Sequence, residues 1–343
     1  MLNKRTFRKI NTYTIIAVYL LIVVGSIVRV TEAGMGCPDW PKCFGGYAPP
    51  THVSQLPENY KEIYLEKRLS KNERLSGLLM RLNLTGLANR IINDPDIQIE
   101  EDYSSTKAWI EYINRLIGVL IGFFIIANMI WSFSYRRIAP IIPVIAVFAF
   151  ILVLFQGWIG SLVVSTNLLP GFISFHMSLA LLLVAFLIYI NYKSSDRVNS
   201  RDLGREFKVM AIVIFVLSLP QILMGTQVRE IIDMLLNQEV GREALISQMP
   251  VIFYIHRSFS LLILIIAIYG AYRLYKVEAL SSHFGLFWLI SLGIIIAEAI
   301  GGAIMTYFEV PRSMQPLHLL GASILFGTLY YLTLISNFKA AKA

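Results

Sequence analysis

Eight apolar segments, each long enough to cross a lipid bilayer, constrain this chain more than any other feature. A helix needs about 20 apolar residues to span a hydrocarbon core of about 30 Å. With 56% hydrophobic and 15% charged residues, the composition agrees with a membrane protein. The sequence therefore predicts an all-α polytopic membrane protein with eight transmembrane helices. The segments cover residues 13–30, 107–132, 139–163, 172–192, 209–228, 251–273, 284–305 and 315–337.

The positive charges predict how these segments are oriented. The formal net charge is +8, and Lys4, Arg5 and Arg8 precede the first segment, while Arg136 and Arg137 lie between the second and third. Short cytoplasmic loops collect Lys and Arg, so both termini are predicted to be cytoplasmic. The charge is thus explained by orientation and not by a nucleic-acid partner. We expect a multi-pass protein of the bacterial plasma membrane, surrounded by lipid.

Matched polar residues indicate that the chain is an internal duplication. Asn114 and His256 are 142 residues apart, and so are His176 and His318. We expect two pseudosymmetric four-helix bundles, formed by residues 1–192 and 193–343. Two further pairs keep the same spacing, namely Gln156 with Glu298 and Gly160 with Gly302.

A long outer loop interrupts this register. The sequence from Gly25 to Arg29 is repeated from Gly225 to Arg229, but 200 residues later, so an insertion falls in the first outer loop, residues 31–105. Residues 56–93 of that loop carry leucines at helical spacing. They predict short amphipathic helices on the membrane surface or on the outer ends of the bundle.

The only two cysteines, Cys37 and Cys43, open the outer loop. The predicted orientation places them on the oxidising side of the membrane, where a disulfide persists. Three interpretations stay open: a structural staple, a redox-active or haem-handling pair, and two free thiols. A loop this short can close, and a bridge that is exposed and strained would be easily reduced.

Three histidines lie inside apolar segments, a few residues after the chain re-enters the membrane from outside. They are His176, His256 and His318. Ionisable groups in hydrocarbon are functional candidates by default, although a single histidine is often a hydrogen-bonding core residue. Imidazoles from two facing helices are the usual way to hold haem iron in a bundle. His256 and His318 are therefore predicted to ligate one haem.

Four arginines lie near the same outer boundary as these histidines: Arg29, Arg115, Arg229 and Arg257. Guanidinium groups bind carboxylates in a bidentate manner, which suits haem propionates. The alternative is that the arginine side chains extend to the lipid headgroups.

Glu111 lies one helical turn before Asn114, hence on the same helix face. Its match in the second copy is Phe253, so an acid is present in only one half. We interpret Glu111 as the catalytic group, which stabilises a developing positive charge or relays a proton. The alternative is an ion pair with an arginine such as Arg115.

These residues together resemble the haem A synthase family, which converts haem O to haem A during cytochrome oxidase assembly. The resemblance covers nearly the whole chain. It is carried by the stretch from Gly25 to Cys43, by the motif Glu111-Tyr-Ile-Asn-Arg115, and by the three membrane histidines.

The resemblance implies that the carboxy-terminal half holds haem b through His256 and His318. It implies that the amino-terminal half binds haem O at His176, and that molecular oxygen oxidises a methyl group to a formyl group near Glu111. The cysteine pair would support haem handling or electron delivery. Implied partners are the farnesyltransferase that makes haem O and the cytochrome oxidase assembly machinery.

The chain departs from the family at Asn114, where the family motif has histidine. An amide is a poor ligand for haem iron, so we predict that His176 alone holds the substrate haem. Its iron would then be five-coordinate or water-bound, and Asn114 and Arg115 would line the pocket. The departure keeps open a non-catalytic haem-binding or electron-transfer protein of cytochrome b type. A transporter would instead show inverted repeats and broken helices.

Overall fold

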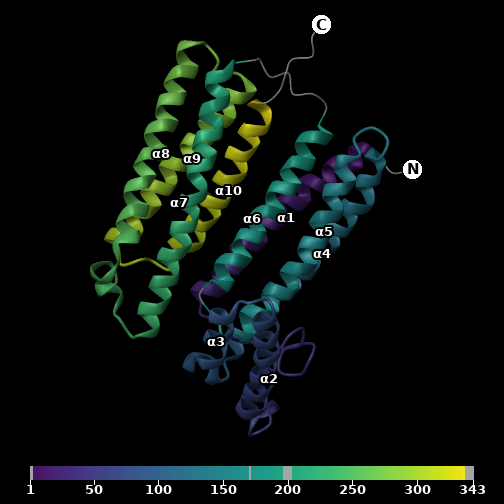
Figure 1. Cartoon of the computed structure of the whole chain (residues 1–343), viewed down its shortest axis with the longest axis vertical. Helices are drawn as coiled ribbons and strands as arrows, with labels where there is room; N and C mark the ends of the chain where they lie inside the picture. Colours follow the sequence, from purple (N-terminus) through teal and green to yellow (C-terminus); the bar gives the residue numbers. More distant parts are fainter. Residues whose placement is uncertain (1–2, 170, 196–202, 337–343) are drawn as a thin grey trace. The chain divides into compact units, whose positions relative to one another are not determined.

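The computed structural model describes residues 3–169, 171–195 and 203–336, and within these ranges it is helical (Figure 1). Eight helices in the described chain are long and apolar enough to cross a membrane. The predicted all-α polytopic fold is thereby confirmed. The last seven residues, part of the predicted cytoplasmic carboxy terminus, lie outside the described ranges. The long helices are α1 (Lys4–Val30), α4 (Ser105–Ser132), α5 (Ile141–Ser165), α6 (Phe172–Ser194), α7 (Arg205–Asn237), α8 (Val251–Lys276), α9 (His283–Tyr307) and α10 (Met314–Ser336).

Two helices extend well beyond the apolar segments that predicted them. Helix α1 begins at Lys4 instead of residue 13, and α7 continues to Asn237 instead of ending at residue 228. The extra turns of α7 are held by packing, because Ile232 is buried in a cluster with Val228 and Leu245. Apolar run length underestimates such helices, since packing beyond the run stabilises the added turns.

Short helices complete the described secondary structure. Helices α2 (Tyr60–Arg81) and α3 (Thr85–Asn93) lie in the long outer loop. The single-turn 3-10 helices are η1 (Val53–Gln55), η2 (Pro95–Gln98), η3 (Phe133–Tyr135), η4 (Arg242–Ala244) and η5 (Ile246–Gln248).

Contacts divide the chain into two compact units, which are described separately. The larger unit comprises Met1–Val23, Phe124–Phe150 and Ala180–Ala343. The smaller unit comprises Val24–Phe123 and Ile151–Leu179. The division into halves 1–192 and 193–343 stays a prediction.

Within the larger unit, α7 to α10 form a four-helix bundle. Helix α7 packs against α8 and α10, and α9 packs against the same two, so α8 and α10 occupy opposite corners. Trp288 is fully buried in its core, and its indole N–H donates to the Ala267 carbonyl at 2.9 Å. Gly270 is required there, because an added Cβ would lie 2.0 Å from the Trp288 ring.

A chain of amides joins three other helices of the larger unit. Asn128 of α4 donates to Asn11 of α1 at 2.8 Å, and Asn11 donates to the Leu187 carbonyl of α6 at 3.1 Å. Both amides are buried. Hydrogen bonds between helices offset the cost of burying polar groups in an apolar bundle and fix the helix register.

In the smaller unit, α2 and α3 pack together, which confirms the helices predicted over residues 56–93. Leu75 and Leu79 of α2 are buried, whereas Leu78 and Leu82 are exposed, as expected for an amphipathic helix. Asn72 of α2 donates to the carbonyl of Ser165, the last residue of α5, at 2.7 Å. The outer loop is therefore attached to the end of a long helix.

A buried ion pair holds the end of this loop. Arg68 of α2 pairs with Glu100 and donates to the Ile99 carbonyl at 2.7 Å. The side chains of Arg68 and Glu100 are only 1% and 5% exposed. Burial lowers the pKa of Arg68 and raises the pKa of Glu100, and the ion pair opposes both shifts.

Candidate functional site

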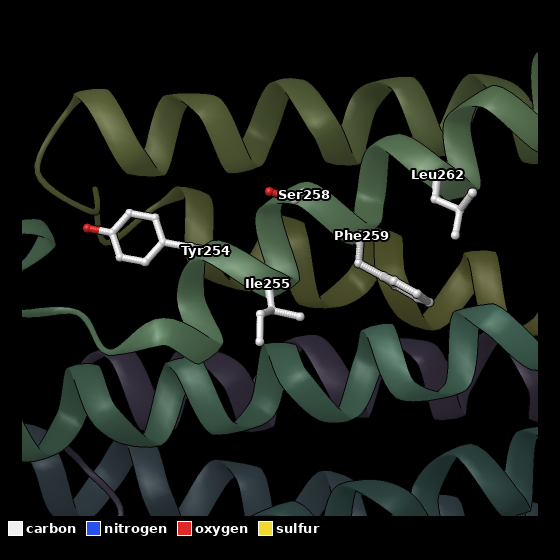
Figure 2. Close-up of a pocket in the computed structure, with 5 residues that line it drawn as sticks. All are labelled: Tyr254, Ile255, Ser258, Phe259 and Leu262. Carbon is white, nitrogen blue, oxygen red and sulfur yellow. The ribbon is translucent and has the colours of Figure 1, made fainter.

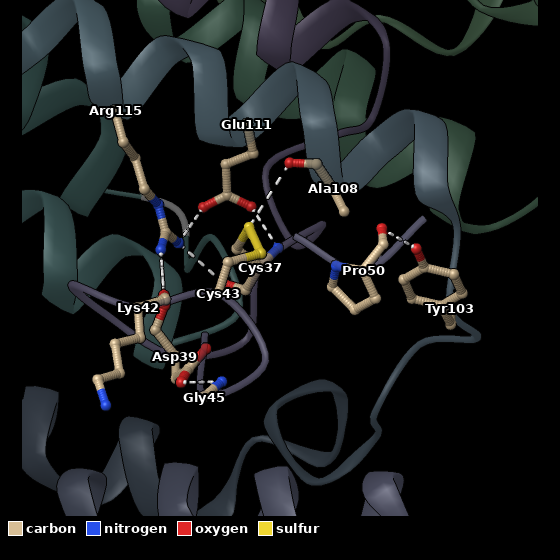
Figure 3. The surroundings of a disulfide bond; sticks show 10 residues. All are labelled: Cys37, Asp39, Lys42, Cys43, Gly45, Pro50, Tyr103, Ala108, Glu111 and Arg115. Atoms are coloured by element: carbon tan, nitrogen blue, oxygen red, sulfur yellow. Dashed lines mark hydrogen bonds and ion pairs between the residues drawn. A yellow bond between two sulfur atoms is a disulfide. The ribbon is translucent and has the colours of Figure 1, made fainter. Parts of the chain in front are cut away.

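Cys37 and Cys43 form a disulfide that is buried in the smaller unit (Figure 3). The two residues are 0% and 1% exposed. The bridge is therefore not exposed, because Ala108 and the rings of Phe44 and Tyr103 pack against the two cysteines. The disulfide excludes the interpretation as free thiols in this structure. A structural role and a redox or haem-handling role both remain compatible with it.

Aromatic side chains from the outer loop surround the bridge. Phe44 contacts the rings of Tyr60, Tyr64 and Tyr103, with ring centroids 6.2, 5.3 and 5.4 Å away. Burial is the main cause that raises the pKa of Tyr64 to about 12. Its phenol therefore stays neutral at physiological pH. The long loop thus supplies an apolar cover over the disulfide.

Glu111 of α4 is held directly by the bridged loop. Its side chain is 5% exposed, Oε2 accepts the Cys37 backbone N–H at 2.7 Å, and Oε1 accepts from Arg115 (Figure 3). The ion pair with Arg115, predicted as the alternative to a catalytic role, is therefore present. It accounts for the burial of an acid in an apolar helix, and it does not test whether the acid also acts in catalysis.

Arg115 binds the bridged loop at several points. Its guanidinium donates to the carbonyls of Asp39 at 2.6 Å, Lys42 at 2.8 Å and Cys37 at 2.9 Å (Figure 3). Arg115 thus donates to backbone carbonyls of the loop, whereas Glu111 accepts a backbone N–H from it. The cysteine loop, Arg115 and Glu111 therefore form one hydrogen-bonded assembly, which we call the Glu111 clamp.

A glycine allows the loop to approach α4 closely. A Cβ added to Gly36 would lie 2.4 Å from the Lys107 carbonyl carbon and oxygen. Only glycine fits at such a backbone contact. The close approach of the loop to α4 therefore explains why glycine occupies position 36 in the stretch that carries the family resemblance.

In the larger unit, His256 of α8 and His318 of α10 project into the four-helix bundle from opposite corners. His256 packs on Gly225 of α7, where an added Cβ would lie 3.1 Å from Cε1. His318 packs on Gly302 of α9, where the corresponding distance is 4.0 Å. Small residues on the two intervening helices thus leave room for both rings.

The smaller unit repeats half of this arrangement. His176 of α6 packs beside Gly160 of α5, where an added Cβ would lie 3.8 Å from Cε1. The fourth position differs, because Gly25 of α1 has no atom within 4 Å of an added Cβ. Asn114 replaces the fourth histidine, and its buried Oδ1 has no hydrogen-bond partner among the described residues.

The remaining predicted site residues have partners of their own. Arg229 pairs with Asp233 at 2.8 Å, and the Arg257 guanidinium lies 5.7 Å from the centroid of the Tyr254 ring. Arg29 lies in the last turn of α1. None of these contacts tests the predicted role in propionate binding.

Two neighbours of the bundle histidines were not predicted as site residues. Gln221 of α7 donates to the His256 backbone carbonyl at 3.1 Å. Glu298 of α9 places Oε2 2.9 Å from Nδ1 of His318. The signal for Glu298 was present in the sequence, because it is a charged residue in the middle of an apolar segment.

A shallow cavity of about 500 Å³ lies along α8, but it is not at the histidines (Figure 2). Four of its five lining residues are exposed, and the fifth, Phe259, is partly buried against the core cluster that contains Ile263 and Ala267. His256 shares the buried face by helical spacing. The cavity is therefore an outer groove, lined by Tyr254, Ile255, Ser258, Phe259 and Leu262.

Comparison with known proteins decides the family. The model of the cytochrome oxidase assembly protein family matches residues 8–73 and 89–330, which is most of the chain. The chain belongs to this family. The unmatched residues between the two ranges belong to the end of α2, the start of α3 and the turn that joins them.

Several curated relatives in this family are named Heme A synthase. The protein of Bartonella tribocorum is 25% identical, over 92% of this chain and 89% of its own length. That of Geobacillus thermodenitrificans is 24% identical, over 97% of this chain and 92% of its own length. That of Shewanella oneidensis is 26% identical, over 62% of this chain and 53% of its own length. The family named from the sequence motifs is therefore confirmed.

Proposed function

We propose that this protein is a membrane oxidoreductase that oxidises a methyl group of haem O to the formyl group of haem A. The observation that supports it most is the Glu111 clamp, which holds one buried acid against the bridged loop. The second copy has Phe253 at the matching position. An acid found in one copy alone suits a reaction chamber, whereas histidines shared between the copies suit haem binding.

The carboxy-terminal copy is proposed to hold haem b on His256 and His318. The residues fit this group, because the two imidazoles belong to helices of one bundle and each packs on a glycine of a neighbouring helix. The buried Nδ1 atom of His256 has no hydrogen-bond partner among the described residues. When bound, haem b supplies one-electron transfer. Arg229 and Arg257 are proposed to hold its propionates.

The amino-terminal copy is proposed to bind haem O as substrate through His176. Asn114 would line an open face of this pocket, so the iron would be five-coordinate or water-bound and a position would remain for molecular oxygen. Arg29 is proposed to bind a propionate. Glu111 keeps a negative charge or a transferable proton beside this pocket, and Arg115 and the Cys37 N–H orient its two oxygens.

The cellular setting follows from the same proposal. The protein is placed in the bacterial plasma membrane with residues 1–192 and 193–343 as the two copies and both termini cytoplasmic. The bridged loop then lies on the outer, oxidising side. The farnesyltransferase that makes haem O is the proposed source of substrate, and cytochrome oxidase assembly is the proposed destination of the product.

Haem extraction tests the activity. The full-length chain is expressed with a haem O source in cells that lack their own haem A synthase, and the extracted haems are separated by chromatography. We expect haem A in these cells and none in cells with the empty vector. Asn114 favours a second candidate, a haem carrier of cytochrome b type. Haem b as the sole bound haem, with haem O unchanged, would support the carrier and contradict the enzyme.

A further inference from the structure

Glu298 is the one acid of α9, and its nearest polar contact is a predicted haem ligand. Its Oε2 lies 2.9 Å from Nδ1 of His318, with the two side chains 17% and 25% exposed. In the present ring orientation Nδ1 of His318 makes no hydrogen bond, although Glu298 lies within hydrogen-bond distance. Because the two atoms are already at hydrogen-bond distance, the pair needs only a change of ring orientation to form the bond.

A glycine of α10 leaves room for the Glu298 carboxylate. Its other oxygen lies against Gly321, one turn after His318 on α10, where an added Cβ would be 2.0 Å from Oε1. Only glycine leaves that space free. The carboxylate is therefore seated between the backbone of α10 and the imidazole.

The other copy lacks both features. Glu298 matches Gln156, an uncharged amide, and Gly321 matches Leu179 at the same spacing. The Gln156 Nε2 atom is buried without a hydrogen-bond partner in the described chain. The acid and the glycine that makes room for it thus occur together in one copy and are absent together from the other.

We propose that Glu298 is a positioning residue that accepts the Nδ1–H of His318 and directs Nε2 toward the haem iron. This inference rests on the proposed haem b site. Ligating histidines commonly donate their other N–H to a carboxylate, which fixes the ring and makes the imidazole a stronger donor. A stronger donor stabilises ferric iron, so Glu298 lowers the reduction potential of this haem. The substrate copy, with Gln156, lacks this effect.

The test is a spectroelectrochemical titration of the purified full-length protein loaded with haem b. We expect Glu298→Gln to keep the low-spin bis-histidine spectrum while shifting the ferric to ferrous equilibrium toward ferrous iron. Second-sphere partners commonly change metal-site properties by about tenfold or more. For a one-electron couple, a tenfold shift of the ferric to ferrous equilibrium constant corresponds to a rise of about 59 mV in the reduction potential.

A second variant covers the case in which Glu298→Gln fails to fold. Gly321→Ala keeps both Glu298 and His318, but its methyl group displaces the flexible carboxylate. We expect the same upward shift of potential. Gln156→Leu, which removes the matching amide in the other copy, is the control and leaves the potential unchanged.

The outcomes separate the two levels of the proposal. An unchanged potential in either substituted protein with a retained bis-histidine spectrum would overturn the role of Glu298 and leave the haem b site intact. A wild-type protein that binds no bis-histidine haem, or one whose spectrum survives His318→Ala, would overturn the site and with it this inference.

Discussion

Single residues distinguish the two copies of this protein more than their helices do. At the first ligand position one copy has Asn114 and the other has His256, and one turn earlier Glu111 stands opposite Phe253 in the alignment of the copies. An imidazole is a haem ligand, and an amide is not an effective one beside it. These two differences therefore separate the proposed haem b bundle from the proposed reaction chamber.

Replacing Glu111 tests its role in the reaction. We expect Glu111→Gln to lower haem A yield by about 100-fold, the low end of what a positioned acid or base contributes. We expect no effect on the haem proposed to bind at His256 and His318, because these residues lie in the larger unit and Glu111 lies in the smaller one. Haem extraction and the low-spin optical spectrum measure the two effects. Glu101→Gln, which replaces an exposed acid of the outer loop just before α4, is the control.

The same variant loses the charge that faces Arg115, so the disulfide must be checked. Thiol labelling after denaturation without reductant reports whether Cys37 and Cys43 are still bridged. Full haem A yield from a protein with Gln at position 111 would show that the acid only anchors the loop.

Restoring the missing histidine tests the open position. We expect Asn114→His to add a second bis-histidine haem and to lower haem A yield, because the new imidazole occupies the side of the iron left for oxygen. The reciprocal variant His256→Asn should remove the low-spin haem of the other copy. Optical spectra of the purified proteins distinguish the sites. Unchanged spectra in Asn114→His would mean that residue 114 does not face a haem.

At the scale of elements, the outer loop is built around buried charge. Helix α2 places Arg68 beside Glu100 and Asn72 beside the end of α5. Breaking a buried pair from one side leaves an uncompensated charge, which costs far more than losing an exposed pair. The loop supplies the aromatic cover of the disulfide, so its stability controls access to the bridge.

Removing one side of this pair should loosen the loop. We expect Arg68→Met to destabilise it by about 3–5 kcal/mol. The pKa of Glu100, already raised by burial, then rises further, so stability present at acidic pH is lost as pH increases through that raised pKa. Limited proteolysis at several pH values measures the effect. Lys61→Met, which removes an exposed pair with Asp102, should change little.

The existence of the elements could be predicted from the sequence, whereas the cover over the disulfide could not. Apolar run length located all eight long helices, because a bilayer-spanning helix needs about 20 apolar residues in sequence. The burial of Cys37 and Cys43 depends on Phe44, Tyr103 and Ala108, two of which lie far along the chain. The place for Glu298 depends on Gly321 in a neighbouring helix. Such contacts carry no local pattern.

At the scale of the whole molecule, charge patterning predicts which loops share a side of the membrane. The loop with the disulfide and the loop between α7 and α8 are expected outside, and the loop between α8 and α9 inside. Ser247→Cys and Ser281→Cys place thiols in the latter two, and both serines are exposed. A membrane-impermeant maleimide should label Ser247→Cys in intact cells and Ser281→Cys only after permeabilisation. The reverse labelling would invert the topology.

The proposed duplication would give the molecule two unequal haem positions. The carboxy-terminal bundle has two histidines, two supporting glycines and a carboxylate beside one ligand. The amino-terminal copy has one histidine, an unpaired amide and the Glu111 clamp. The proposal that one copy transfers electrons and the other oxidises the substrate depends on these differences between the copies.

The most direct measurement is an electron paramagnetic resonance spectrum of the purified full-length protein loaded with haem b. We predict a single low-spin bis-histidine signal that disappears in both His256→Ala and His318→Ala and persists in His176→Ala. A signal that survives either of the first two substitutions, or two bis-histidine signals in the wild-type protein, would contradict the assignment of the two copies.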